Sequence, residues 1–183
     1  MFYQFFHSSV FPRSFSSYFI TLITKVPSPI RIRDFRPISL LGSLYKLEAK
    51  VLAGRLAPMM DKLISSNQST FIKGRMLVDG VVAVNEIIDV ARKTKKECLI
   101  IKVDFEKAHD YVSWRFLDYM MRSLGFSDRW YRWIRACVFC GNLSVLVNGC
   151  PTEEVNIRRG LKQGDPLALF LFLLVVEGLS GLV

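Results

Sequence analysis

Apolar residues along this chain fall into two kinds of pattern, short runs typical of strands and longer stretches with helical spacing. Residues 18–25 and 35–40 are short apolar runs separated by two prolines, which predicts a hairpin with lysine and arginine at its turn end. Across residues 43–64 the spacing is helical, and Pro58 should kink or divide the helix. The stripe expected to face the core consists of Leu44, Leu47, Val51, Leu52, Leu56, Met59, Met60 and Leu63.

The second half of the chain alternates helical and strand patterns without internal repeats. A helix is predicted at about 79–93, and its expected buried side consists of Val81, Val82, Val84, Ile87, Ile88 and Ala91. The later elements, in order, are helices at about 114–124 and 128–140, a hairpin of 143–148 and 153–157 around Asn148-Gly149, and an apolar helix from about 167. A further strand would be expected next.

Residues 99–103 (Leu-Ile-Ile-Lys-Val) form a nearly unbroken apolar run rich in β-branched side chains, which predicts a buried strand. The run ends on Asp104, and Glu106 follows. Acidic side chains at the end of a strand suit hard cations with oxygen ligands, and pairs of such cations assist phosphoryl transfer. The alternative is a core strand followed by a helix whose N-cap happens to be acidic. Taken alone, this run does not decide between the two.

The net charge of the chain indicates which classes of molecule it is expected to bind. Its 183 residues are 51% hydrophobic and 22% charged, a globular composition with enough length for one domain or two packed subdomains. The net charge of +9 and the isoelectric point near 9.6 indicate a polyanionic partner. Nucleic acid is the first candidate and an acidic membrane surface the second.

Cysteine spacing and hydropathy indicate neither a metal site nor a membrane span. Cys137 and Cys140 have the gap of a zinc knuckle, but no second pair matches it, so buried free cysteines in a reducing compartment are expected. The N-terminus lacks the features of a signal peptide. The apolar run 167–176 has about half of the roughly 20 residues that a bilayer requires. We therefore expect an intracellular protein, nuclear or cytoplasmic, with membrane anchoring by 167–176 as a remote alternative.

Three motifs, in order and approximate spacing, resemble the reverse transcriptases of retrotransposons that lack long terminal repeats (LINE-type elements). They are Asp-Phe-Arg-Pro-Ile-Ser-Leu at 34–40, Lys-Val-Asp-Phe-Glu-Lys-Ala at 102–108 and Arg-Gly-Leu-Lys-Gln-Gly-Asp-Pro-Leu at 159–167. The resemblance begins near Phe11 and implies an RNA-directed DNA polymerase. It also implies an α+β fold, with a fingers-like subdomain at 1–75 and a partial palm, an antiparallel sheet backed by helices, at 76–183.

The resemblance implies a nucleotide site made from all three motifs. Asp104 would be the catalytic carboxylate and the first metal ligand, with the main-chain carbonyl of Phe105 near a second ion; Mg²⁺ is the expected metal. Lys25 and Arg36 would lie over the triphosphate of the incoming nucleotide. The complete family enzyme would use two ions to activate the 3′ hydroxyl of the primer and to neutralise charge on the phosphate.

Further roles follow from the same resemblance. His109 would lie under the sugar of the nucleotide, and Gln163 with Gly164 would support the templating base and the nucleotide. Lys73 and Arg75 belong to the link between fingers and palm and could contact nucleic-acid phosphates. The expected partners are therefore an RNA template, a DNA primer and a deoxynucleoside triphosphate.

The chain departs from the family pattern at several positions. Family members usually have proline at the position of Thr24, tyrosine or phenylalanine at that of His109, and Ser-Pro in place of Ala168-Leu169. The chain also stops at Val183, before the aromatic-Ala-Asp-Asp turn that carries the other essential carboxylates. We therefore expect a truncated chain that is inactive on its own. The alternative function is a non-catalytic, basic nucleic-acid-binding remnant.

Overall fold

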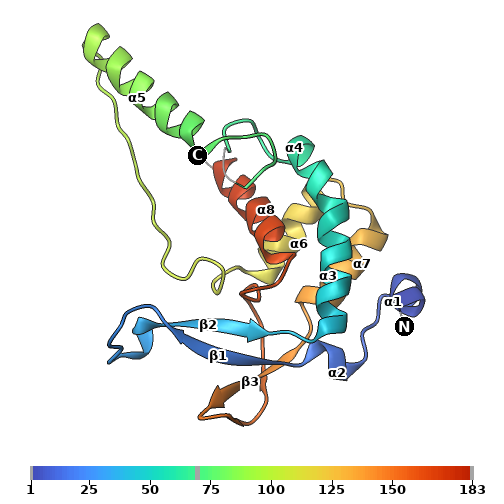
Figure 1. The fold of residues 1–183 in the computed structure, drawn as a ribbon. Coiled ribbons are helices and arrows are strands. Elements are labelled where there is room, and N and C mark those ends of the chain that lie inside the picture. Colours follow the sequence, from blue (N-terminus) through green and yellow to red (C-terminus); the bar gives the residue numbers. More distant parts are fainter. Residues whose placement is uncertain (1, 69–70, 182–183) are drawn as a thin grey trace.

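The computed structural model describes residues 2–68 and 71–181, and its sheet is built around the hairpin predicted near the N-terminus (Figure 1). Strands β1 (Tyr18–Thr24) and β2 (Phe35–Leu40) pair antiparallel, with Phe19 opposite Leu40. Strand β3 (Asn142–Val147) pairs with β1 in parallel and also pairs antiparallel with the short β4 (Cys150–Pro151) and β5 (Val155–Asn156). Because β1 and β3 come from opposite sides of the predicted boundary at 75, one sheet joins both predicted subdomains.

Helices cover most of the remaining described chain, which confirms the predicted α+β class. They are α1 (Phe2–Ser8), α2 (Arg13–Ser16), α3 (Ser43–Leu56), α4 (Met60–Leu63), α5 (Leu77–Thr94), α6 (Trp114–Ser123), α7 (Asp128–Val138) and α8 (Ala168–Ser180), with 3₁₀ turns at Ile32–Asp34 and Ala57–Met59. Pro58 lies in the second 3₁₀ turn and divides α3 from α4, as predicted. The predicted turn at Asn148-Gly149 is also present, since both residues have positive φ.

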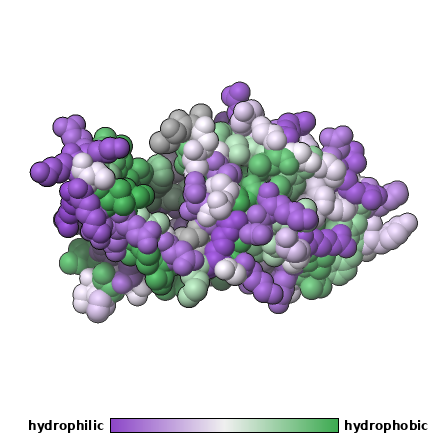
Figure 2. All heavy atoms as spheres, turned by 90° about the horizontal axis from the view of Figure 1, so that it is seen from above, coloured by the Kyte–Doolittle hydropathy of each residue, from purple (hydrophilic) through white to green (hydrophobic). Residues whose placement is uncertain are grey.

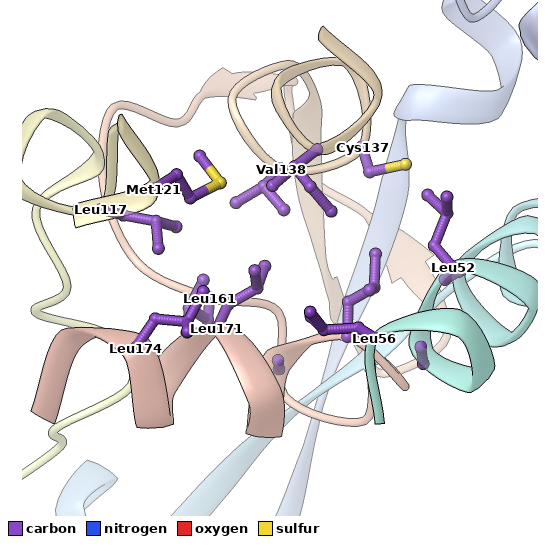
Figure 3. Packing of buried hydrophobic residues seen from close by; sticks show 14 of the residues in the cluster. Leu52, Leu56, Leu117, Met121, Cys137, Val138, Leu161, Leu171 and Leu174 are labelled. Carbon is purple, nitrogen blue, oxygen red and sulfur yellow. The ribbon is translucent and has the colours of Figure 1, made fainter. Parts of the chain in front are cut away.

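Four helices supply the hydrophobic core, which Figure 3 shows from close by. The core side chains labelled there are Leu52 and Leu56 of α3, Leu117 and Met121 of α6, Cys137 and Val138 of α7, Leu161, and Leu171 and Leu174 of α8. All of them are at least nine-tenths buried. The core therefore joins the N-terminal helices to the last helix of the described chain.

The buried face of α3 differs from the predicted stripe. Leu44, Leu47, Val51 and Met59 are exposed, while Leu52, Leu56 and Met60 are buried as expected. The face that packs consists of Tyr45, Glu48, Ala49, Leu52, Ala53 and Leu56. These residues follow the helical repeat as well as the leucines do, but the face includes a tyrosine, a glutamate and two alanines. Apolar periodicity alone therefore selected a rotated face.

The segment from α5 to about residue 105 lies apart from the core, and here the sequence prediction is wrong (Figure 1). α5 forms, but none of its residues is buried. Residues 99–103 form no strand; Leu99 is 85% exposed and Ile101 74% exposed. A strand needs a neighbour for its backbone N–H and C=O groups, and no strand among the described residues pairs with this run. Apolar side chains consequently reach the surface among hydrophilic ones, as Figure 2 shows.

The prediction of buried free cysteines is confirmed for Cys137 and wrong for Cys140. Cys137 is a buried free thiol, whereas Cys98, Cys140 and Cys150 are free and exposed. Among the described residues, no helix has both the length and the hydropathy required to cross a membrane.

Candidate nucleotide site

The loop 160–165 holds the candidate site together by bonding to two distant segments. Its Gly160 N–H donates to the Val112 carbonyl (2.8 Å), and its Leu161 N–H donates to the His109 carbonyl (2.9 Å). On the other side, the Ser39 N–H of β2 donates to the Gln163 carbonyl (3.0 Å). The loop therefore connects the hairpin to the segment that follows Asp104.

Glycine is required at the start of this loop. Gly160 has φ +90°, and a Cβ there would lie 2.8 Å from the Asp110 carbonyl oxygen. A larger residue would combine backbone strain with a clash against backbone that the loop itself holds in place. The close approach of the two segments thus depends on this position.

Four predicted nucleotide-binding residues line one hollow of about 490 Å³. Arg36 comes from β2, His109 from the turn that precedes α6, and Gln163 and Gly164 from the loop before α8. The complete lining is Arg36, Ile38, Lys107, Ala108, His109, Gln163, Gly164, Asp165, Ala168 and Leu169. Segments more than 120 residues apart in sequence thus meet at one place, with two cations and several apolar groups.

Two of these side chains have defined partners. The Gln163 side-chain amide donates to Oδ1 of Asp110 (3.0 Å). The His109 ring packs against Phe172 of α8, with ring centroids 4.3 Å apart. Asp110 thus orients the amide, and His109 forms one wall of the hollow.

A buried polar cluster lies beneath the hollow. The Tyr45 hydroxyl donates to Oδ2 of Asp165 (2.5 Å) and also lies 3.1 Å from the Cys137 carbonyl oxygen. Lys162 Nζ donates to that same carbonyl (2.9 Å) and lies over the Tyr45 ring at 4.3 Å. Asp165 Oδ1 accepts from the Leu167 N–H (2.9 Å) at the start of α8. The cluster thus ties the loop to α3 and α7.

Burial controls the ionisation of this cluster. It raises the pKa of Tyr45 well above its ordinary value and that of Tyr18 to about 12, and the Asp165 carboxylate adds to both shifts. Burial lowers the pKa of Lys162 and raises that of Asp165, although the Tyr45 hydrogen bond opposes the second shift. Burial thus disfavours the charged forms of both side chains, and the hydrogen bonds to Asp165 oppose part of this effect at its carboxylate.

Asp104 does not belong to the hollow. Asp104 and Phe105 lie in the exposed segment that precedes it, and neither lines the hollow. Among the described residues, no three His, Cys, Asp or Glu side chains are close enough to hold a metal ion. The predicted carboxylate therefore belongs to no such cluster, and the residues described do not fit a two-ion centre.

The remaining predicted cations lie elsewhere. Lys25 Nζ donates to the Arg33 carbonyl (3.0 Å) at the turn end of the hairpin, outside the hollow. Lys73 is exposed in the link that follows α4, two residues of which (69–70) lie outside the described chain. Arg75 lies in the same link, but its guanidinium faces the protein.

The Arg75 guanidinium makes several hydrogen bonds to the backbone at the end of α4. It donates to the carbonyl oxygens of Ser65, Gln68 (2.7 Å) and Ile64 (3.0 Å). It also pairs with the Asp61 carboxylate at 2.9 Å. These contacts give Arg75 a structural role, since most of its donors are already engaged.

The sequence interpretation missed the buried cluster. An aspartate just before Pro166 at the start of an apolar helix is a recognisable capping signal, and Asp165 does accept a bond there. For Tyr45 and Lys162 the pattern offered no such signal, because their partners lie on other elements. Only the packing of α3 against the loop reveals them.

Comparison with known proteins identifies the family of this chain. The sequence profile described as "Reverse transcriptase (RNA-dependent DNA polymerase)" matches residues 23–183. The chain belongs to this family. The resemblance drawn from the three motifs is thereby confirmed, and so is the interpretation as a reverse transcriptase domain. Reverse transcriptases in general act on a nucleic-acid template and primer with deoxynucleotides and depend on a divalent metal.

Relatives of this reverse transcriptase chain include proteins of transposons and retrotransposable elements. It is 28% identical to the "Transposon TX1 uncharacterized 149 kDa protein" of Xenopus laevis, over 86% of this chain and 12% of that protein. It is 29% identical to the "Retrovirus-related Pol polyprotein from type-1 retrotransposable element R2" of Popillia japonica, over 87% of this chain and 22% of that protein. It is 27% identical to the "Probable RNA-directed DNA polymerase from transposon BS" of Drosophila melanogaster, over 88% of this chain and 18% of that protein. The chain thus spans less than a quarter of these relatives.

Proposed function

We propose that this chain is the fingers (1–75) and first palm portion (76–183) of a retrotransposon RNA-directed DNA polymerase, and that its hollow receives the incoming deoxynucleotide. The observation that supports this proposal is that Arg36 and Gln163, from the first and third motifs, line one hollow with His109, which directly follows the second motif. A match that includes these motifs favours a polymerase over the alternative of a basic remnant without a nucleotide site.

Each lining residue has a role that suits its chemistry. The Arg36 guanidinium binds triphosphate oxygens, with Lys25 as a second cation farther along the hairpin. His109, held against Phe172, supports the sugar. Gln163, oriented by Asp110, and Gly164 support the base pair between nucleotide and template. Lys73 and other exposed cations contact the RNA template and the DNA primer.

The residues proposed to hold the metal, Asp104 and Phe105, lie outside the hollow. In the complete polymerase, Asp104 and the Phe105 carbonyl would hold Mg²⁺, which would supply charge neutralisation at the transferring phosphate. Among the described residues, Asp104 belongs to no cluster of three or more possible metal ligands. We therefore expect the isolated chain to bind nucleotide without extending a primer.

The test compares two arginines of the same hairpin. A fluorescent deoxynucleoside triphosphate is titrated into the chain and into Arg36→Ala and Arg33→Ala. Both residues are exposed, but only Arg36 lines the hollow. We expect Arg36→Ala to weaken binding about tenfold or more, since a charge-assisted contact contributes roughly 1.5–3 kcal/mol, and Arg33→Ala to have little effect. Equal losses would indicate diffuse charge attraction and contradict the proposal.

A primer-extension assay tests the role of Asp104. The chain is incubated with an RNA template, an annealed DNA primer, deoxynucleotides and Mg²⁺, alone and as Asp104→Asn. Absence of product in both agrees with the proposal when the nucleotide titration shows Arg36-dependent binding. Incorporation that Asp104→Asn leaves unchanged would contradict the assignment of Asp104.

A further inference from the structure

A second, larger hollow of about 690 Å³ lies between the start of α6, α7 and residues 158–159. Four arginines line it, Arg115, Arg135, Arg158 and Arg159, and all four are exposed. No predicted site residue belongs to it. The lining comes from three segments, so the arginines gather only in the folded chain.

The hollow has a large excess of positive charge. Asp118 is its single acidic lining residue, and Arg122 lies 3.4 Å from that carboxylate. Arg115 and Arg158 make no hydrogen bond or ion pair within the described part of the chain, so their guanidinium donors face solvent. Several unpaired guanidinium groups around one hollow attract an anion with more than one charge.

Aromatic rings form the floor and one edge of the hollow. Trp114 and Phe139 stack with ring centroids 5.5 Å apart, and the indole N–H of Trp114 donates to the Gly160 carbonyl (2.8 Å). At the edge, Tyr111 is 59% exposed, and the Arg159 guanidinium lies 4.8 Å from its ring centroid. A simple anion does not interact favourably with exposed ring faces. The unpaired bases of a single strand, in contrast, stack on such rings while its phosphates bind arginine.

The second hollow shares lining residues with a smaller hollow that adjoins the candidate nucleotide site. Trp114 and Arg159 also line this smaller hollow of about 230 Å³, which includes Gln163, and Gln163 lines the nucleotide hollow. Loop 158–163 thus contributes lining residues to all three hollows.

We propose that this arginine–aromatic hollow binds a single-stranded nucleic-acid segment. Its phosphates contact Arg115, Arg158 and Arg159, and one base stacks on Tyr111. The proposal rests on the proposed function in one respect, namely that the bound strand is the template of the same polymerase. The binding itself requires only the arginines and the exposed ring.

The charge part is tested with two matched double variants. Arg115→Gln/Arg158→Gln removes two lining charges, whereas Arg129→Gln/Arg132→Gln removes two charges from α7 outside the hollow. Binding of a fluorescent twelve-nucleotide single-stranded RNA is measured by anisotropy over a series of salt concentrations. We expect the lining pair to weaken binding at least tenfold and to flatten the salt slope by about 1.4, the value for two phosphate contacts on a single strand, and the control pair to do neither. Equal effects of both pairs would overturn the proposal.

The stacking part is tested with two exposed tyrosines. Tyr111→Ala should weaken RNA binding about tenfold with an unchanged salt slope, while Tyr119→Ala on α6, which is 63% exposed, should have little effect. A blunt-ended duplex RNA should bind independently of Tyr111, because its bases are not free to stack. Loss of affinity for the duplex equal to that for the single strand would contradict base stacking.

The same variants separate this proposal from the proposed function. Arg115→Gln/Arg158→Gln should still bind the fluorescent deoxynucleotide through Arg36. If Arg36-dependent nucleotide binding fails while RNA binding still depends on the lining pair, the proposed function fails and the strand site stands. If nucleotide binding holds while the lining pair has no effect on RNA, the strand site alone is refuted.

Discussion

The side-chain amide of Gln163 donates a hydrogen bond to the carboxylate of Asp110 across 3.0 Å, although the two residues lie 53 positions apart in sequence. The contact is partly buried and lies beside two backbone hydrogen bonds between the same segments. The amide therefore has one defined orientation toward the candidate nucleotide. Asp110, which carries no predicted catalytic role, is in this way a positioning residue for Gln163.

A double-mutant cycle should measure this contact. Asp110→Ala and Gln163→Ala should each destabilise the chain, and their combined effect should fall short of additivity by about 1 kcal/mol, since a hydrogen bond to a charged group couples the two sites. Urea unfolding of the four proteins gives the coupling. The exposed pair Asp118 and Arg122 serves as a control, with an expected coupling below about 0.5 kcal/mol. Additive effects of Asp110→Ala and Gln163→Ala would show that the contact contributes no stability.

The buried hydroxyl of Tyr45 should contribute substantially to stability. Tyr45→Phe keeps the ring but removes the donor that Asp165 accepts at 2.5 Å, so a buried carboxylate loses a partner. We expect the free energy of unfolding to fall by about 1–3 kcal/mol. Tyr119→Phe, at an exposed position of α6, should change it by less than about 0.5 kcal/mol. Equal effects of the two substitutions would contradict an anchoring role for the hydroxyl.

The contacts that Arg75 makes at the end of α4 should stabilise the folded chain. Arg75→Ala removes several donors from carbonyl oxygens at the end of α4, and we expect a loss of about 1–3 kcal/mol in urea unfolding. Arg75→Lys should recover little, because an ammonium cannot reproduce the planar fork. Lys73→Ala, in the same link but exposed, should leave stability unchanged. A stable Arg75→Ala protein with weakened RNA binding would instead favour the phosphate contact that the sequence predicts.

Local spacing was sufficient to predict most elements of the fold, but it could not predict which surfaces meet. The hairpin of β1 and β2, the break at Pro58 and the turn at Asn148-Gly149 each depend on residues close together in sequence. The buried face of α3 depends on distant partners such as Cys137 and Asp165, so the apolar pattern predicted only part of it.

The candidate site, like the fold, was predicted from the sequence only in part. Arg36, His109 and Gln163 line one hollow, because backbone bonds from loop 160–165 reach both other segments. Asp104 does not join them, because its position depends on strand pairing for residues 99–103, and no described strand supplies that pairing. An apolar run predicts the tendency to form a strand, but it cannot supply the neighbouring strand.

The exposed run 99–103 should make the chain self-associate. Unpaired backbone beside β-branched side chains is a template for pairing with another chain. Ile101→Lys should reduce the concentration-dependent rise in sedimentation coefficient without lowering the melting temperature, since Ile101 is 74% exposed. Val10→Lys places the same charge at another exposed apolar position outside this segment and should leave association unchanged. Equal suppression by both would indicate a general charge effect.

Glu48 should reduce stability at neutral pH. It is fully buried on α3, and neither carboxylate oxygen has a hydrogen-bond partner among the described residues. Burial raises its pKa above the ordinary value of 4.5, so the folded chain binds this proton more tightly than the unfolded chain does. The contribution of Glu48 to stability is therefore most favourable below that value and is lost as the pH rises through the folded-state pKa.

Glu48→Gln removes this titration. We expect the variant to gain stability relative to the parent chain as the pH rises from about 4 to about 7, reaching about 1 kcal/mol, because a neutral amide is less costly to bury than a carboxylate. Urea unfolding at several pH values measures the difference. Glu86→Gln, at an exposed position of α5, should show no such pH dependence. A difference between Glu48→Gln and the parent that stays constant over this range would mean that Glu48 ionises in the folded chain as it does in the unfolded one.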